Sequence, residues 1–150
     1  MKKPLISLLI IFGTNALGMY YSWYLKFWWF DVANHFLGGF FVAMLMAAYL
    51  KDNILKKAFL KNMLIVIGAA TFIGVVWEFS EYIANQILVG PFYRWFQVRT
   101  YFMGDLQDTI SDLLLDILGA TLFTTYHLLR SRKAHEAESR LQNQSNSGAQ

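Results

Sequence analysis

Four aspartates precede and enter the last long apolar segment of the sequence, at positions 105, 108, 112 and 116. Asp108, Asp112 and Asp116 are four residues apart, so on a helix they lie along one face over about 12 Å. On a soluble helix, such a face would simply be solvated. On a helix that enters a membrane, each carboxylate needs a partner, a proton or a bound cation. These acids are therefore the first candidates for a functional site.

Two other apolar segments carry polar groups at one end. Asp31 and His35 stand one helical turn apart at the start of one segment, and Glu78 and Glu81 lie late in another. From the helical rise, we place His35 about 6 Å and Asp116 within about 15 Å of the same membrane face. Depths this similar predict one shared site on three helices. For Asp105, we favour a simpler role at the positive end of a helix dipole, a role that would also suit Asp108.

Three kinds of compensation would stabilise such a cluster: protonation, pairing with arginine or a protonated His35, or a divalent cation bound by oxygens and one imidazole. The residue types do not choose between them. If the protein is an enzyme, Glu78, Asp112 and His35 are the candidate catalytic residues, and Arg94 and Arg99 would receive a phosphate or lipid headgroup. The candidate metal ligands are Asp31, His35, Glu78, Glu81, Asp108, Asp112 and Asp116.

The composition is that of an integral membrane protein. Of 150 residues, 56% are hydrophobic, 17% aromatic and only 15% charged, which is too apolar for a soluble domain of this size. The absence of cysteine excludes disulfides and thiolate metal sites. The basic residues form short clusters between apolar segments, as membrane topology requires, so we expect no binding to nucleic acid.

Four segments are long and apolar enough to cross a bilayer as helices: residues 5–25, 32–50, 63–89 and 108–129. We therefore predict an all-α fold, an integral membrane four-helix bundle, as one domain over residues 1–133. Gly90 and Pro91 are expected to end the third span, an aromatic loop to occupy residues 92–103, and a disordered cytoplasmic tail to follow at residues 134–150. Gly38, Gly39 and the pair Ala70 and Gly74 predict close contacts between helices.

The distribution of charge predicts the orientation. All but three of the 13 Lys and Arg residues lie at the N-terminus, in the loop 51–61, or after residue 129. The exceptions are Lys26, Arg94 and Arg99. The positive-inside rule then places both termini in the cytoplasm and the acidic cluster at the outer face. His127 and His135 would lie far from the cluster, in structural or solvated positions.

Three segments resemble the pattern of VanZ-like membrane proteins and are closest to the related YjdF-like group of the bacterial inner membrane: FDVANHFLGGF (30–40), VWEFSEYI (76–83) and GDLQDTISDLLLDILGA (104–120). The resemblance implies site roles for five residues and a packing role for Gly119 with Ala120. It also implies a cell-envelope function, which in some members is glycopeptide resistance. Asp116 stands where many of these sequences have Asn. The five residues are Asp31, His35, Glu78, Asp112 and Asp116.

Two functional classes follow. In the first, the outward-facing cluster binds an ion, a proton or an envelope-lipid headgroup. In the alternative, the protein is a metal-dependent membrane enzyme acting on a lipid-linked phosphate or a similar envelope substrate. The expected partners are the lipid bilayer, an envelope lipid or small ligand at the outer face, and further copies of the chain. A cofactor is left open, with a divalent metal ion as the candidate.

Overall fold

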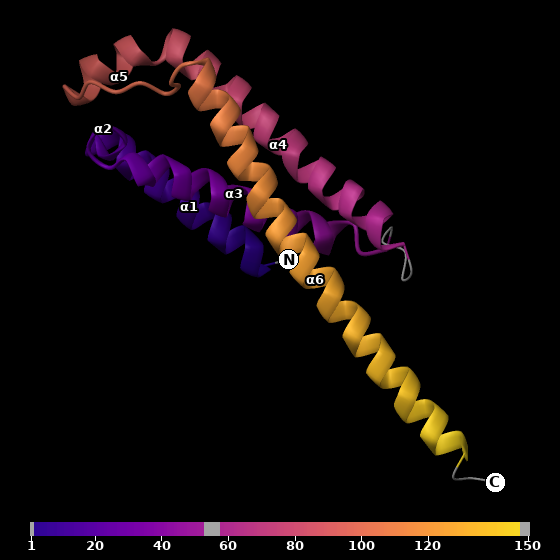
Figure 1. Ribbon diagram of the computed structural model, residues 1–150. Helices are drawn as coiled ribbons and strands as arrows, with labels where there is room; N and C mark the ends of the chain where they lie inside the picture. Colours follow the sequence, from indigo (N-terminus) through magenta and orange to yellow (C-terminus); the bar gives the residue numbers. More distant parts are fainter. Residues whose placement is uncertain (1, 53–57, 148–150) are drawn as a thin grey trace.

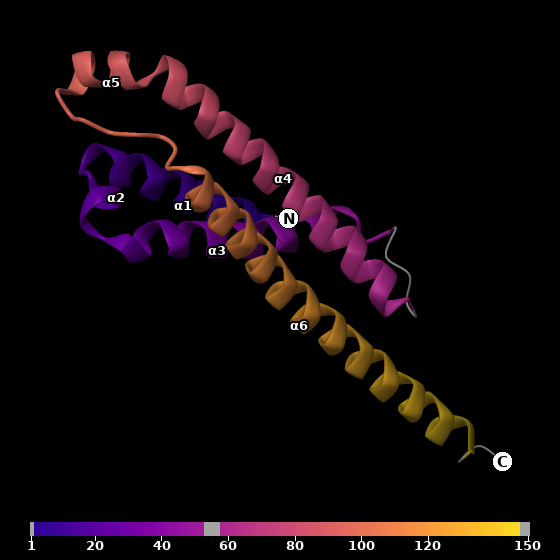
Figure 2. The same ribbon diagram turned by 45° about the horizontal axis from the view of Figure 1, so that its top comes forward.

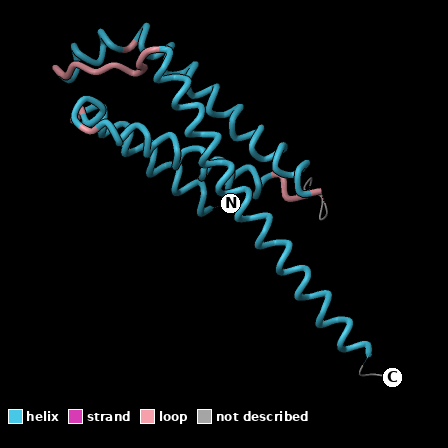
Figure 3. Tube along the Cα trace, viewed as in Figure 1, coloured by secondary structure: helices cyan, strands magenta, loops and turns pink. Residues whose placement is uncertain are grey.

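The computed structural model describes residues 2–52 and 58–147, which form six helices and no strand (Figures 1 and 3). Four of these helices contain segments long and apolar enough to cross a membrane, which confirms the predicted all-α membrane fold. Residues 53–57 of the predicted basic loop lie outside the described residues. The helices are α1 (Lys2–Tyr20), α2 (Trp23–Lys26), α3 (Trp28–Tyr49), α4 (Phe59–Ile87), α5 (Val89–Phe96) and α6 (Leu106–Ser147).

Helix α3 is the centre of the bundle. It packs most extensively against α6 and also contacts α1 and α4, and α6 contacts α4 as well. The short helices α2 and α5 and the connection from α5 to α6 lie together at one end of the bundle (Figures 1 and 2). This end also receives the start of α3, the end of α4 and the start of α6, so it brings together the three segments that carry the candidate site residues.

Each of the three central helices buries a stripe in which every fourth residue faces the interior, because residues four apart share one helical face. Half of the residues in these stripes are small, which lets membrane helices approach closely. The ionisable members of the stripes, His35 of α3, Glu78 of α4, and Asp112 and Asp116 of α6, lie toward the end of the bundle that carries α2 and α5. The stripes are His35, Gly39, Ala43 and Ala47 in α3; Asn62, Val66, Ala70, Gly74 and Glu78 in α4; and Asp112, Asp116, Ala120, Thr124 and Leu128 in α6.

Glycines set the spacing of α3 and α6. A Cβ atom at Gly39 would collide with the backbone of Asp116, and one at Gly119 would collide with the carbonyl oxygen of Phe36. The predicted close contacts at these two positions are confirmed. Gly38 differs, because a Cβ there would lie 3.7 Å from the nearest atom, Asp116 Oδ1, an ordinary contact. Gly39, not Gly38, therefore admits the neighbouring helix.

The first helix is shorter than the predicted span 5–25. It ends at Tyr20, and Ser22 adopts the left-handed conformation with φ 57° before α2 begins. The apolar run continues through this break without proline, so composition alone does not mark it. The turn lets Gly18 pack directly against the ring of Phe30 at the start of α3.

The prediction of an aromatic loop over residues 92–103 is wrong in its first part, because α5 extends to Phe96. Gly90 and Pro91 lie within the first turn of α5, where proline loses no helical hydrogen bond, and the preceding helix ends at Ile87. Gln97, with φ 56°, ends α5. The backbone N–H of Phe102 donates to Asn85 Oδ1 at 3.2 Å, which fastens the remaining loop to α4.

The C-terminal segment also differs from the prediction. Residues 134–147 continue α6 as a helix rather than a disordered tail. The segment AHEAESRLQNQ is rich in good helix formers, and it extends a helix that is already nucleated, so each added residue costs little.

Candidate functional site

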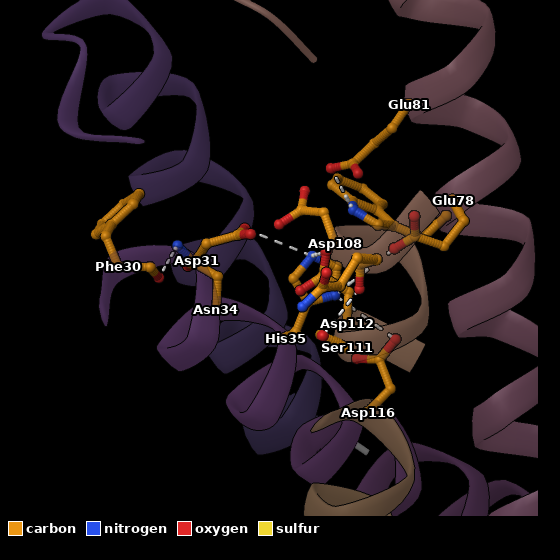
Figure 4. A network of polar contacts seen from close by, with 12 residues as sticks. Phe30, Asp31, Asn34, His35, Glu78, Glu81, Asp108, Ser111, Asp112 and Asp116 are labelled. Atoms are coloured by element: carbon orange, nitrogen blue, oxygen red, sulfur yellow. Dashed lines mark hydrogen bonds and ion pairs between the residues drawn. The ribbon is translucent and has the colours of Figure 1, made fainter. Parts of the chain in front are cut away.

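His35 lies at the centre of a cluster of four carboxylates (Figure 4). Its Nε2 atom is 3.6 Å from Asp31 Oδ1 and 3.8 Å from Asp112 Oδ2. Its Nδ1 atom is 3.9 Å from Glu78 Oε1 and 3.7 Å from Asp116 Oδ2. Each ring nitrogen therefore faces two carboxylates, and three different helices contribute to the cluster.

Helical spacing explains this arrangement. Asp31 precedes His35 by one turn on α3, so both side chains share a face. Asp112 and Asp116 are one turn apart on α6, and the imidazole lies between them, with one ring nitrogen toward each. The close approach at Gly39 brings α6 near enough for both contacts. Glu78 reaches the ring from α4.

The distances in the cluster are too long for direct hydrogen bonds, which join nitrogen and oxygen at about 2.7 to 3.2 Å. Two ligands of one metal ion, each about 2.0 to 2.6 Å from it, lie roughly 3 to 5 Å apart. The observed 3.6 to 3.9 Å falls within this range. Glu78 Oε1 is buried and has no hydrogen-bond partner among the described residues. The cluster therefore has unfilled bonding capacity.

Glu81 adds a fifth carboxylate above Glu78. It accepts a hydrogen bond of 2.8 Å from Trp77 Nε1, which fixes its orientation. Among the described residues, two sets of three hold possible ligand atoms within 4.8 Å of one another: Asp31, His35 and Asp112, and His35, Glu78 and Glu81. His35 belongs to both sets, so the two are alternatives or parts of one larger site.

The other predicted site residues lie farther out. Asp105 accepts a hydrogen bond of 3.0 Å from the backbone N–H of Asp108; it caps the start of α6, which agrees with the role expected for it. Asp108 is exposed, its carboxylate lies against Gly104, and it belongs to neither ligand set. Arg94 is exposed at the end of α5. Arg99 lines a pocket beside the cluster.

This polar pocket, of about 460 Å³, lies between the α5–α6 connection and the ends of the central helices. Tyr24 of α2 also lines it. Burial, together with the nearby acids Asp31 and Glu81, raises the pKa of the Tyr24 phenol, so it remains a neutral hydrogen-bond donor. The charged residues in the lining are Arg99 and the acids Asp31, Glu81, Asp108 and Asp112.

A second pocket, of about 350 Å³, lies on the other side of the cluster between α1, α3 and α4. His35 and Asp116 border it, and most of its wall is apolar. It also contains Asn15, a buried residue of α1 that belongs to none of the sequence motifs described above. The signal available in the sequence was an amide within an otherwise apolar span.

Two histidines were expected to lie outside the cluster. His127 is exposed and stacks on Phe123, with ring centroids 5.5 Å apart. The side chain of His135 lies outside the described part of the structure. Sequence motifs also gave no role to Trp77, whose indole both orients Glu81 and borders the apolar pocket.

The sequence was compared with known proteins and protein families. No curated protein and no solved structure matches it. A family model with the description "predicted membrane protein (DUF2238)" matches residues 3–133, which include all four candidate spans apart from one terminal residue of the first and of the last, and every residue around His35. The chain therefore belongs to this family of membrane proteins.

Proposed function

We propose that this membrane protein binds a divalent cation at the cluster around His35. One observation carries the proposal: a buried imidazole is surrounded by four carboxylates from three helices, at spacings that suit ligands of one ion. Carboxylates within a membrane cost about 2.5 to 3.5 kcal/mol each unless they are compensated. A single imidazolium would offset one of the four charges, whereas a divalent ion offsets two and satisfies several oxygens at once.

The donor set is a mixture of carboxylate oxygens and one imidazole, which suits Mg²⁺, Mn²⁺ or Zn²⁺. One nitrogen of His35 would bind the ion, and the other would carry the proton and face the remaining pair of carboxylates. Such a carboxylate partner fixes the tautomer and orientation of a metal-binding histidine. With the ion on Nε2, the carboxylate ligands would be Asp31 and Asp112, whereas Glu78 and Asp116 would face the protonated Nδ1 atom.

The relationship to VanZ-like and YjdF-like proteins, a position in the inner membrane and a role in the cell envelope or in glycopeptide resistance are parts of the same proposal. They are supported by the motifs, because the five residues that the resemblance singles out form one cluster, in which Asp31, Glu78, Asp112 and Asp116 surround the imidazole of His35. The outward orientation of the cluster rests on the distribution of Lys and Arg.

A metal-dependent enzyme is the second candidate, and the polar pocket favours it. The pocket borders Asp31 and Asp112 and also contains Arg99. An ion held there with an open coordination position would polarise a phosphate oxygen, while the Arg99 guanidinium would hold a second oxygen. A lipid-linked phosphate would meet both groups from the membrane surface.

The test measures cation binding by the full chain purified in detergent. Mg²⁺, Mn²⁺ and Zn²⁺ are added separately to wild type, to Asp112→Asn and to Asp105→Asn, and the midpoint of thermal unfolding is recorded. A cation at 100 times its Kd stabilises the folded state by about 2.7 kcal/mol. Wild type and Asp105→Asn should show this stabilisation, and Asp112→Asn should lose most of it.

Asp105→Asn is the matched control, because it makes the same chemical change at the residue that caps the same helix, and asparagine also caps helices well. Metal analysis of each purified protein accompanies the unfolding data. If none of the three cations binds or stabilises wild type, or if Asp112→Asn responds like Asp105→Asn, the proposal is wrong.

A further inference from the structure

We propose that the apolar pocket between α1, α3 and α4 binds the hydrocarbon chain of a membrane lipid that carries a hydroxyl group at its head. The chain would lie along α1, and the hydroxyl would meet Asn15 beside the His35 cluster. This proposal goes beyond cation binding, because it rests on the pocket and on Asn15, neither of which needs an ion. It names a class of ligand, a lipid alcohol, for the pocket beside the His35 cluster.

The pocket is polar at one end only. Its lining on α1 runs from Leu5 to Asn15, about 15 Å along a helix. The residues near Leu5 are aliphatic, whereas Asn15 lies at the end where Asn34, His35 and Asp116 also reach the pocket. The volume of about 350 Å³ lies within the roughly 300 to 1,000 Å³ typical of ligand pockets. This shape and polarity suit an elongated amphiphile.

The pocket also has a side that faces lipid. Leu9 and Phe12 of α1 belong to its wall and are 68% and 61% exposed on the surface of the bundle. Across from them, α4 meets α1 in an edge contact between Phe12 and Trp77, with ring centroids 6.3 Å apart. A chain could enter between these helices from the bilayer, without passing through water.

Asn15 specifies the head of the lipid. The residue is 6% exposed, and its Oδ1 atom has no hydrogen-bond partner among the described residues. A buried acceptor without a donor costs about 1 to 3 kcal/mol. At the cluster, Glu78 Oε1 is also a buried acceptor without a hydrogen-bond partner among the described residues. A hydroxyl donates to such atoms, and unlike an ammonium group it does not compete with a cation for the carboxylates.

The experiment uses two photoreactive probes that differ in one hydrogen-bond donor. Full-length protein is reconstituted in phosphatidylcholine vesicles that contain traces of hexadecanol with a diazirine in its chain, or of the methyl ether of this alcohol. After irradiation, labelled peptides are mapped by mass spectrometry. Val42 reports on the pocket, and Leu64, which is 68% exposed on α4 outside the pocket, reports on bulk lipid.

In wild type, the alcohol should label Val42 about two- to tenfold more than the ether, the range expected for one hydrogen bond, while Leu64 should show a ratio near one. Asn15→Leu should bring the ratio at Val42 to about one. This variant should fold, because it replaces a buried amide, whose oxygen has no hydrogen-bond partner among the described residues, with a hydrocarbon side chain in an apolar span.

A second pair of variants tests whether labelling of Val42 requires the volume of the apolar pocket. Gly38→Leu places a side chain in the pocket and should lower labelling of Val42 by both probes at least threefold. Gly68→Leu is the matched control, since Gly68 has open space around it and does not line the pocket. If Gly38→Leu does not fold, Asn15→Leu alone decides the question.

Equal labelling of Val42 by alcohol and ether in wild type overturns the proposal, as does an unchanged ratio in Asn15→Leu. Loss of all label at Val42 because a second copy covers the pocket overturns it too. Labelling is repeated with EDTA, which removes divalent cations, and the alcohol-to-ether ratio at Val42 should stay the same. If the alcohol labels Val42 more than the ether does but the protein binds no cation, only the cation proposal is refuted. If the protein binds a cation but the two probes label Val42 equally, only the lipid proposal is refuted.

Discussion

Adding one methyl group at Gly39 should separate α3 from α6 and disrupt the site that these helices share. The Cβ of Gly39→Ala would lie 2.6 Å from Asp116 Cα and 2.7 Å from its carbonyl carbon. Carbon atoms in contact prefer about 3.5 to 4.0 Å, so the helices must move apart by roughly 1 Å. Both opposing atoms belong to the backbone, so no side-chain rotation relieves the clash.

Such overpacking typically costs about 1 to 3 kcal/mol, which lowers the unfolding midpoint of a chain of this length by about 2 to 12 °C. Because α6 carries Asp112 and Asp116, the same movement would lengthen contacts to His35 that now measure 3.8 and 3.7 Å. Stabilisation by a divalent cation should therefore fall as well.

The assay is thermal unfolding in detergent, with and without cation, and Gly38→Ala is the control. Both variants add the same methyl group and gain the same helix propensity, but the Cβ at Gly38 makes only an ordinary contact of 3.7 Å. Gly38→Ala should unfold at or above the wild-type temperature. Equal midpoints for the two variants would show that the α3–α6 spacing is not limited at Gly39 and would refute this reasoning.

Two further predictions concern topology and the unity of the cluster. A reporter that is active only in the cytoplasm should work when fused after Leu129 and fail when fused near Phe96; the reverse result would place the cluster at the inner face. Glu78→Gln and Asp112→Asn, measured alone and together, should change unfolding free energies non-additively by about 0.5 to 3 kcal/mol, because both acids face one imidazole. Additive effects with and without divalent cation would mean that the carboxylates do not act as one site.

Much of the architecture was predictable because it depends on local properties of the chain. Long apolar runs must be helical in a bilayer, since only a helix satisfies its own backbone there. The fixed rise of a helix then placed His35, Glu78 and Asp112 at similar depths. The break at Ser22 and the helix α5 were missed, since neither is marked by a clear change in composition.

The tertiary structure decided which candidates meet. The rotation of each helix about its axis depends on packing between helices, and the glycine contacts on α3 and α6 determine it here. That packing turned Asp112 and Asp116 toward His35, left Asp108 exposed, and made Gly39 rather than Gly38 the point of closest approach. The sequence thus determined the spans and their polar ends, whereas the contacts around His35 depend on side chains from three helices distant in the chain.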